Sequence, residues 1–302
     1  MRIGVDIGGT KLEAAAIDGE GTLHLRRRVT TPRKDYDATI EAIAELVNTI
    51  EAELGHRCSL GFGIPGTISQ ATGLVKNAYN SPFNGRDLHH DLAERFGRPI
   101  RLMNDANCFS ISETKGGAAA GAEIVFGAIL GTGCGSGIVA HGQLLVGPNS
   151  ICGEWGHNSI PWPEADEWPG LKCDCGKRGC IETFISGTGL SRQHAIDTGE
   201  ELQAQEIVAR AEAGQVASNY SLERYESRLA RALASIINIL DPNVIVLGGG
   251  MSNVSRLFEN VPKLWSDWVF SDTFTTELRA PKFGDSSGVR GAAWLWPESV
   301  EG

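Results

Sequence analysis

The stretch that decides the fold is Ile3-Gly4-Val5-Asp6-Ile7-Gly8-Gly9-Thr10-Lys11, near the start of a chain of 302 residues. Aliphatic residues alternate with small or acidic ones up to a pair of glycines, and a second apolar run follows at residues 12–17. This pattern predicts a strand, a tight turn and a second strand, with a third strand near residues 22–30. A glycine hairpin, rather than a strand that leads into a helix, therefore opens the protein.

The first glycine turn has the composition of an anion site. The motif DIGGTK is neither a P-loop nor a dinucleotide fingerprint, because it lacks GxxxxGK[ST] and no GxGxxG opens a helix. The backbone amides of Gly8 and Gly9 can form a concave nest for anionic oxygens. Thr10 adds a hydroxyl donor and Lys11 adds a cation. Asp6 would repel a phosphate directly but suits a magnesium ion through water. The alternative is an ordinary hairpin whose glycines only permit positive φ.

Two further glycine runs extend this pattern. The motif GTGCGSG offers a second nest of the same kind, with candidate residues Gly131, Thr132, Gly133 and Gly135. The triplet Gly248-Gly249-Gly250 follows a buried strand and leaves a floor without side chains at the strand's carboxyl end. Ligands of open α/β sheets usually bind at such ends, so a nucleoside base could lie there. A loose strand-to-helix loop is the alternative for the triplet.

Strands and helices alternate through the rest of the chain, which predicts an α/β protein. Residues 4–10 and 127–133 share their glycine and aliphatic positions. This weak repeat indicates two related domains with a boundary near residues 116–121, although coincidence in glycine-rich strands is the alternative. Periodicity and turn residues predict helices at 37–54, 88–96, 221–240, 254–265 and 287–295, and strands at 61–65, 100–103 and 244–247.

Composition and charge argue against several classes of protein. Hydrophobic residues make up 41% of the chain and charged residues 21%, which is typical of a packed, soluble protein. The net charge of −10 argues against broad nucleic-acid contact, which needs a basic stripe. No apolar run approaches the roughly 20 residues of a membrane span, and the N-terminus has no signal-peptide pattern. We therefore expect a cytoplasmic protein with seven reduced cysteines and no nucleic-acid or membrane partner.

One segment has the composition of a metal site. His157 precedes the motif CDCGKRGC, and together they supply the set His157, Cys173, Cys175 and Cys180. Three thiolates and one imidazole are the ligands of a closed structural zinc site, with no position left for a reactive water. A disulfide is disfavoured in the cytosol, and a redox pair would favour C-x-x-C over C-x-C. The sequence therefore predicts structural Zn²⁺.

Five motifs together resemble the ROK family of sugar kinases and repressors: DIGGTK, NDAN, GTGCGSG, GEWGH and CDCGKRGCIE. The resemblance covers essentially the whole chain. It implies an α/β, actin-like/hexokinase-like (ribonuclease H-like) fold, with two α/β domains around a central cleft for ATP and sugar. The N-terminal domain would comprise residues 1–117 plus 287–302, and the C-terminal domain residues 118–286, with the zinc-binding loop at 157–180. A homodimer is a further expectation of the family.

The resemblance also implies roles for particular residues. The two glycine turns would bind the phosphates of ATP with Mg²⁺, and the glycine triplet would lie near adenosine. Asp105 would be the general base that accepts the proton of the sugar hydroxyl. By its position at a strand-to-helix junction alone, Asp105 could also be a helix N-cap. The sugar ligands would be Asn104, Asp105, Glu154, His157 and Glu182, with Gly66 and Asn80 as weaker candidates.

The flanking residues suggest one branch of the family. The segments GEWGHN, GCIETFISGTG and GDSSGVRGAAWLWP resemble bacterial fructokinases that also accept mannose. The resulting prediction is ATP-dependent phosphorylation of a free hexose at its 6-hydroxyl, with D-fructose as the substrate. Glucose, N-acetylglucosamine or N-acetylmannosamine is the alternative substrate. A sugar-responsive repressor is a remote alternative, because such members carry an additional N-terminal helix-turn-helix domain and this acidic chain starts just before its first strand.

Overall fold

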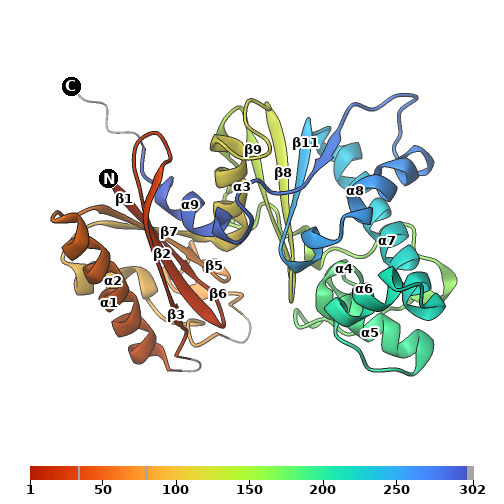
Figure 1. Ribbon diagram of the computed structural model, residues 1–302, viewed down its shortest axis with the longest axis horizontal. Coiled ribbons are helices and arrows are strands. Elements are labelled where there is room, and N and C mark those ends of the chain that lie inside the picture. The colour runs from red at the N-terminus through yellow and green to blue at the C-terminus, as the bar shows by residue number, and fades with distance from the viewer. Residues whose placement is uncertain (33–34, 79–80, 298–302) are drawn as a thin grey trace. The chain divides into compact units, whose positions relative to one another are not determined.

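The computed structural model describes residues 1–32, 35–78 and 81–297, and the chain forms two compact units (Figure 1). The first unit comprises Met1–Gly117, Leu144–Cys152 and Asp285–Gly302. The second unit comprises Ala118–Gln143 and Gly153–Gly284. Both units combine a mixed sheet with helices, so the expected α/β class is confirmed.

The division differs from the sequence-based one at the segment Leu144–Cys152, which the expected boundaries assign to the second unit. Two hydrogen bonds attach this segment to the first unit. Lys76 Nζ donates to the carbonyl of Asn149 at 3.2 Å, and Gln70 Nε2 donates to Ser150 Oγ at 2.8 Å. The last segment of the first unit also starts two residues earlier than expected, at Asp285.

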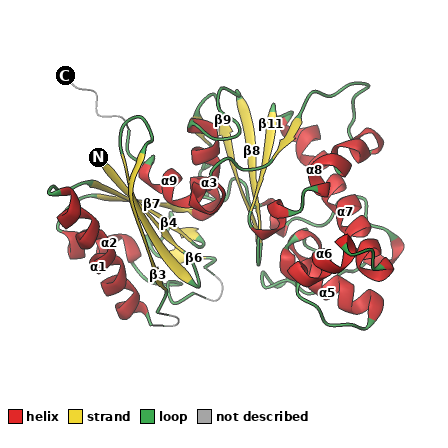
Figure 2. Ribbon diagram, viewed as in Figure 1, coloured by secondary structure: helices red, strands yellow, loops and turns green. Residues whose placement is uncertain are grey.

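The first unit is built on a five-stranded sheet in the order β3-β2-β1-β4-β7. Figure 2 shows this sheet in yellow, with helices in red beside it. Strands β1, β2 and β3 are antiparallel neighbours, whereas β1, β4 and β7 run parallel. The strands are β1 (Arg2–Ile7), β2 (Lys11–Ile17), β3 (Leu23–Thr30), β4 (Ser59–Ile64) and β7 (Ile100–Asn104). The other elements are the hairpin β5 (Thr67–Ile68) and β6 (Val75–Lys76), and the helices α1 (Tyr36–Leu54), α2 (Leu88–Phe96), α3 (Asp105–Lys115) and α9 (Ser287–Ala293).

Large apolar residues and glycines alternate along β1 and β4, which gives the sheet two different faces. Ile3 and Phe62 are fully buried in the core shared with α1 and α2. Helix α9 packs on the other face of the sheet (Figure 1). Gly4 and Gly61 lie against this helix. A Cβ at either glycine would lie 1.9 Å from a backbone oxygen of α9. Glycine is therefore required at both positions for the helix to contact the strands directly.

The second unit repeats this topology. Its sheet has the order β10-β9-β8-β11-β12, with β8 antiparallel to β9 and parallel to β11. Its strands are β8 (Ile124–Leu130), β9 (Cys134–Ala140), β11 (Val244–Gly248) and β12 (Glu277–Arg279), and the short strand β10 (Gln143–Leu144) ends on the first residue of the segment assigned to the first unit. Strands β2 and β9 are both seven residues long and begin at Lys11 and Cys134. Gly8 and Gly131, in the two glycine turns, are as far apart in the sequence as Lys11 and Cys134 are. The repeat in the sequence therefore corresponds to two equivalent hairpins.

The helices of the second unit differ from expectation in three respects. The sequence indicated neither α4 (Glu182–Ile185), α5 (Gly187–Thr198) nor α6 (Ala204–Glu212), and α7 (Val216–Leu240) begins before the expected Ser221. The single helix expected at 254–265 is instead α8 (Arg256–Asn260) followed by a 3₁₀ helix at Pro262–Asp267. Pro262 has no N–H for the α-helical hydrogen bond, so the α-helix ends before it. No helix in the described part of the chain could cross a membrane.

Candidate functional site

The carboxylate of Asp6 lies near the end of β1, on the face of the sheet that packs against α9. A Cβ added at Gly288 of α9 would lie 3.0 Å from Asp6 Oδ2. At Gly63 of β4, an added Cβ would lie 3.7 Å from Oδ1. A side chain at position 288 would displace the carboxylate, so the close approach of α9 helps to fix the position of Asp6.

Asp105 is the first residue of α3 and follows β7 directly. The N-cap of this helix is Asn104, whose Oδ1 accepts the N–H groups of Ala106 at 3.0 Å and Asn107 at 3.3 Å. The capping role that the sequence left open for Asp105 therefore belongs to Asn104. Asp105 Oδ1 accepts the N–H of Ala106 at 2.8 Å, which holds the carboxylate at the helix start.

Gly66 lies beside this helix start, because Asn104 Nδ2 donates to its carbonyl at 3.0 Å. Gly66 has φ 72°, and a Cβ there would lie 2.4 Å from the carbonyl oxygen of Lys76, so the position requires glycine. The first unit thus brings Gly66, Asn104 and Asp105 together. Asn80, the remaining sugar candidate from this part of the sequence, lies outside the described residues.

The carboxyl groups near β1 interact electrostatically. Burial raises the pKa of Asp6 from 3.8 to about 7, and the charges of Asp105 and Glu13 add to this effect. The cations Lys11 and Arg28 act in the opposite direction. Asp6 and Asp105, which come from a strand and a helix far apart in the sequence, are therefore close neighbours. Two carboxyl groups are thus placed together at this end of the sheet.

The first glycine turn differs in its backbone from a positive-φ turn. Neither Gly8 nor Gly9 has φ in the left-handed region, so permitting that conformation is not their role here. The N–H of Gly8 donates to the carbonyl of Lys11 at 3.1 Å, and Thr31 Oγ1 donates to the carbonyl of Gly8 at 2.7 Å. A Cβ at Gly9 would meet no atom within 4 Å, and Thr10 is exposed. The backbone of the turn is therefore open at Gly9 and Thr10.

The second glycine turn is open at its first two residues. The N–H of Gly131 donates to the carbonyl of Gly133 at 3.0 Å, a Cβ at Gly131 would meet no atom within 4 Å, and Thr132 is exposed. Gly135 lies in β9, where it pairs with Ile129, so it belongs to the strand rather than to the turn.

The glycine triplet lies next to this second turn. Gly248 ends the buried strand β11, whereas Gly249 and Gly250 are exposed. Gly249 has φ 77°, and a Cβ there would lie 2.6 Å from the backbone of Leu130, the last residue of β8. Only glycine permits this contact. Two of the three segments expected to bind nucleotide are therefore neighbours at the carboxyl ends of parallel strands.

The GEWGH segment packs directly on β9. Gly153 has φ 93°, and a Cβ there would lie 2.4 Å from the carbonyl oxygen of Ser136. A Cβ at Gly156 would lie 2.3 Å from the carbonyl oxygen of Cys134. These contacts place Glu154 beside the strand that follows the second glycine turn. The glycines of the motif therefore serve close backbone packing.

The expected metal ligands form one cluster. The ligand atoms of His157, Cys173, Cys175 and Cys180 all lie within 4.8 Å of one another. His157 Nδ1 is 3.5 Å from Cys173 Sγ, and the sulfurs of Cys175 and Cys180 are 3.5 Å apart. This separation exceeds the roughly 2.05 Å of a disulfide, and all seven cysteines are free. The four residues thus form one candidate metal centre.

Glu182, the first residue of α4, connects this cluster to the second glycine turn. Its Oε1 lies 3.5 Å from Cys173 Sγ, and its Oε2 accepts the N–H of Cys134 at 3.0 Å. Glu154 also lies in this region. Burial, the charge of Glu182 and, more weakly, the charge of Glu154 raise the pKa of the Cys134 thiol. The second unit thus brings Glu154, His157 and Glu182 together beside the turn.

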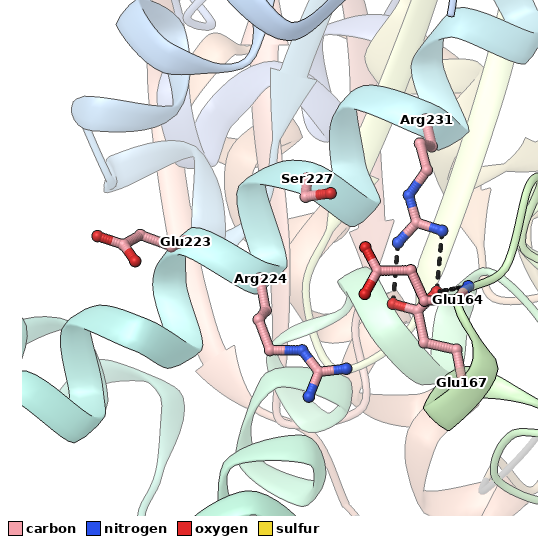
Figure 3. Close-up of a pocket in the computed structure, with 6 residues that line it drawn as sticks. All are labelled: Glu164, Glu167, Glu223, Arg224, Ser227 and Arg231. Carbon is pink, nitrogen blue, oxygen red and sulfur yellow. Dashed lines mark hydrogen bonds and ion pairs between the residues drawn. The ribbon is translucent and has the colours of Figure 1, made fainter. Parts of the chain in front are cut away.

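One buried ionic cluster was not predicted from the sequence. Arg231 donates to both oxygens of Glu167, at 2.8 Å each (Figure 3). Arg228 Nε donates to Oε1 of the same residue at 2.7 Å. All three side chains are at most 3% exposed. Arg231 Nη1 also donates to the carbonyl of Trp162 at 2.6 Å. The cluster therefore holds the loop before the cysteine motif on α7.

Glu167→Gln should lower the free energy of unfolding at pH 7 by about 3–5 kcal/mol, because it leaves two buried guanidinium groups without a counter-charge. Burial alone would raise the pKa of Glu167, but the hydrogen bonds from Arg231 and Arg228 lower it from 4.5 to about 2. The charged form therefore stabilises the fold above about pH 4.5, and this contribution is lost as the pH falls towards 2.

Urea unfolding of both proteins at pH 7 and pH 3 tests this prediction. The difference in unfolding free energy between wild type and Glu167→Gln should be smaller at pH 3. Glu223→Gln is the matched control, because Glu223 lines the same hollow of about 200 Å³ but is exposed. Equal effects of the two substitutions would contradict a stabilising role for the buried cluster.

Two α/β units with equivalent sheets, each with a glycine turn after its first strand, define the actin-like, hexokinase-like fold, and solved structures confirm it. The ROK hexokinase from Thermus thermophilus is similar with a TM-score of 0.85 and 29% identity, over 97% of this chain and 96% of that one. A ROK family glucokinase from Streptomyces griseus, in complex with glucose and AMPPNP, has a TM-score of 0.82 and 28% identity, over 97% and 98%.

The family profile described as the ROK family matches residues 2–299, so the chain belongs to the ROK family. An N-acetyl-D-glucosamine kinase from Photobacterium profundum is 36% identical over 302 residues, which cover 98% of this chain and 99% of that protein. This relative is named for one of the alternative substrates rather than for fructose. The expected fructokinase branch is therefore not confirmed.

Proposed function

We propose that this protein is an ATP-dependent hexose kinase that phosphorylates the 6-hydroxyl of N-acetyl-D-glucosamine. The observation that carries the proposal is the similarity to the N-acetyl-D-glucosamine kinase from Photobacterium profundum along nearly the whole of both chains. The placement of Asp105 beside Asp6 supports the reaction type. Phosphoryl transfer needs an acceptor for the alcohol proton and compensation of the phosphate charge near that acceptor.

Asp105 is the proposed general base. Its carboxylate is fixed at the start of α3 and is half-buried, so it can accept the proton of the attacking hydroxyl. Asn104 and Gly66 are proposed to line the sugar beside it, and the proposed role of Asn80 is retained. From the second unit, Glu154, His157 and Glu182 are the proposed ligands of the other hydroxyls, because carboxylates and imidazole pair well with them.

The nucleotide is proposed to bind along the glycine segments. Gly8, Gly9, Thr10 and Lys11 would contact phosphates from the first unit, and Gly131, Thr132, Gly133 and Gly135 from the second. The triplet Gly248, Gly249 and Gly250 would lie near adenosine. Bound Mg²⁺ supplies neutralisation of the phosphate charge, and the acidic pair of Asp6 and Asp105 fits such a cation.

The Cys₃His cluster is proposed to hold structural Zn²⁺. Ligand atoms about 2.0–2.3 Å from a tetrahedral ion lie roughly 3.3–3.8 Å apart, and the two separations of 3.5 Å fit this range. Four protein ligands leave no position for a reactive water, so the ion would hold the loop. If His157 binds through Nδ1, its Nε2 would be the nitrogen that binds a sugar hydroxyl.

Fructose is retained as a second candidate substrate, because the segments GEWGHN, GCIETFISGTG and GDSSGVRGAAWLWP resemble those of fructokinases. A coupled assay of ADP release across N-acetylglucosamine, N-acetylmannosamine, glucose, mannose and fructose tests both candidates. We expect kcat/KM for N-acetylglucosamine to be at least about tenfold above the others. A value for fructose severalfold above that for N-acetylglucosamine would assign the second candidate. If no hexose is phosphorylated, the proposed activity is wrong.

A further inference from the structure

The two equivalent hairpins hold their glycine turns in different ways. In the first unit the neutral residue Thr31 holds the turn. Its Oγ1 donates to the carbonyl of Gly8 at 2.7 Å, and its N–H donates to the carbonyl of Thr10 at 3.1 Å. In the second unit a carboxylate does so, because Glu182 Oε2 accepts the N–H of Cys134 at 3.0 Å. Equivalent turns therefore have supports of different charge.

The chain around Glu182 contacts both ends of the second turn. At one end Glu182 binds Cys134, and at the other the N–H of Gly187 donates to the carbonyl of Gly131 at 2.7 Å. Gly133, between them, leaves room for the carboxylate, because a Cβ there would lie 2.7 Å from Glu182 Oε2. The helix α4 and the start of α5 thus support the whole turn.

A carboxylate at this position has an electrostatic cost if the turn binds phosphate, because two negative charges approach each other in a partly buried site. A hydrogen bond that only supports the turn could be made by a neutral side chain, as Thr31 does in the first unit. Glu182 has a second function under the proposed activity, since it is one of the sugar ligands. The same side chain therefore connects the turn, the sugar ligands and the cysteine cluster.

We propose that Glu182 is a positioning residue for the phosphate-binding turn at residues 131–134, so that nucleotide affinity depends on a side chain that also binds the sugar. This inference rests on the proposed function and extends it. Because one carboxylate serves both sites, occupation of either site biases the position of the carboxylate at the other. Coupling of this kind is reciprocal, so sugar and nucleotide should change each other's affinity by the same factor.

Calorimetric titration of Mg²⁺·AMPPNP into sugar-free protein tests the positioning role. Glu182→Ala removes the acceptor and should weaken AMPPNP binding by about tenfold or more. Glu182→Gln retains an oxygen that can accept the N–H of Cys134, so its AMPPNP affinity should stay within about threefold of wild type. Both variants should bind the sugar more weakly. Unchanged AMPPNP affinity in Glu182→Ala, or equal losses in both variants, would overturn the positioning role.

A second variant covers the case in which Glu182→Ala does not fold or loses its metal. Gly133→Ala retains the carboxylate but places a Cβ against Oε2, so it should weaken AMPPNP binding while the zinc content stays at the wild-type value. Unchanged affinity in this variant would overturn the proposal. If the wild type binds AMPPNP but phosphorylates no hexose, the proposed activity fails while the effect of Glu182 on nucleotide binding is still measured.

Discussion

Asp105→Asn should lower kcat for hexose phosphorylation by about 10²–10⁴-fold, the usual contribution of a general base. The substitution keeps the shape of the side chain and an oxygen that can accept the N–H of Ala106, a bond that measures 2.8 Å in the structure. The helix start should therefore survive, since its cap is Asn104. Sugar affinity should change little, because an amide can still hydrogen-bond a hydroxyl. Steady-state assays and calorimetry separate the two effects.

The matched control is Asp87→Asn. Asp87 caps α2 in the same unit, where its Oδ1 accepts the N–H of His90 at 3.1 Å, but no motif places it at the site. Its substitution should cost at most about 1 kcal/mol of stability and leave kcat unchanged. A turnover within about threefold of wild type in Asp105→Asn would remove Asp105 from the role of base.

The sequence predicted those helices and hairpins whose bounds depend on nearby residues, such as capping residues, turn glycines and a regular apolar period. The apolar period and the flanking Asp87 and Gly97 define α2, and the expected helix at 88–96 has the observed bounds. The hairpins around the glycine turns were predictable for the same reason. The helices α4–α6 were not predicted. The first of them spans only four residues, and its position depends on the loop beside it rather than on its own period.

In the candidate site, too, contacts between residues close in sequence were predicted, and contacts between distant residues were not. Three of the four metal ligands lie within eight residues of one another, so their spacing alone predicted the cluster. The contact of Glu182 with Cys134 joins residues 48 apart, and the contact of Arg231 with Glu167 joins residues 64 apart. No local pattern indicates such pairs. Their formation depends on how α4 and α7 pack, and packing is determined by the whole unit.

The glycines show why turns were easier to predict from the sequence than contacts between distant elements. The sequence suggested that Gly8 and Gly9 shape a turn, and the turn is present without left-handed φ at either glycine. Nothing in the sequence indicated that Gly4 and Gly61 are required by α9, because this helix comes from the other end of the chain. A glycine that admits a distant backbone has no local signature, whereas a glycine in a turn has flanking strands.

Cys175→Ser should abolish zinc binding and lower the free energy of unfolding by about 5 kcal/mol or more. Serine is a poor zinc ligand at neutral pH, and loss of a structural metal is among the largest effects of a single substitution. Sugar affinity should fall by roughly 10–100-fold as well, because His157 and Glu182 are held by the same cluster. Metal analysis, thermal unfolding and sugar titration measure the three effects, and removal of the metal from wild type by a chelator should reproduce them.

The matched control is Cys152→Ser. Cys152 is half-buried and free, and it is not one of the four clustered residues. This variant should retain about one zinc per chain, with unfolding and sugar affinity close to wild type. Because the proposed zinc ion supports both the stability and the sugar affinity of the protein, both should be lost over the same range of chelator concentration. A metal-free preparation that binds sugar and turns over like wild type would contradict both the zinc site and its support of the sugar ligands.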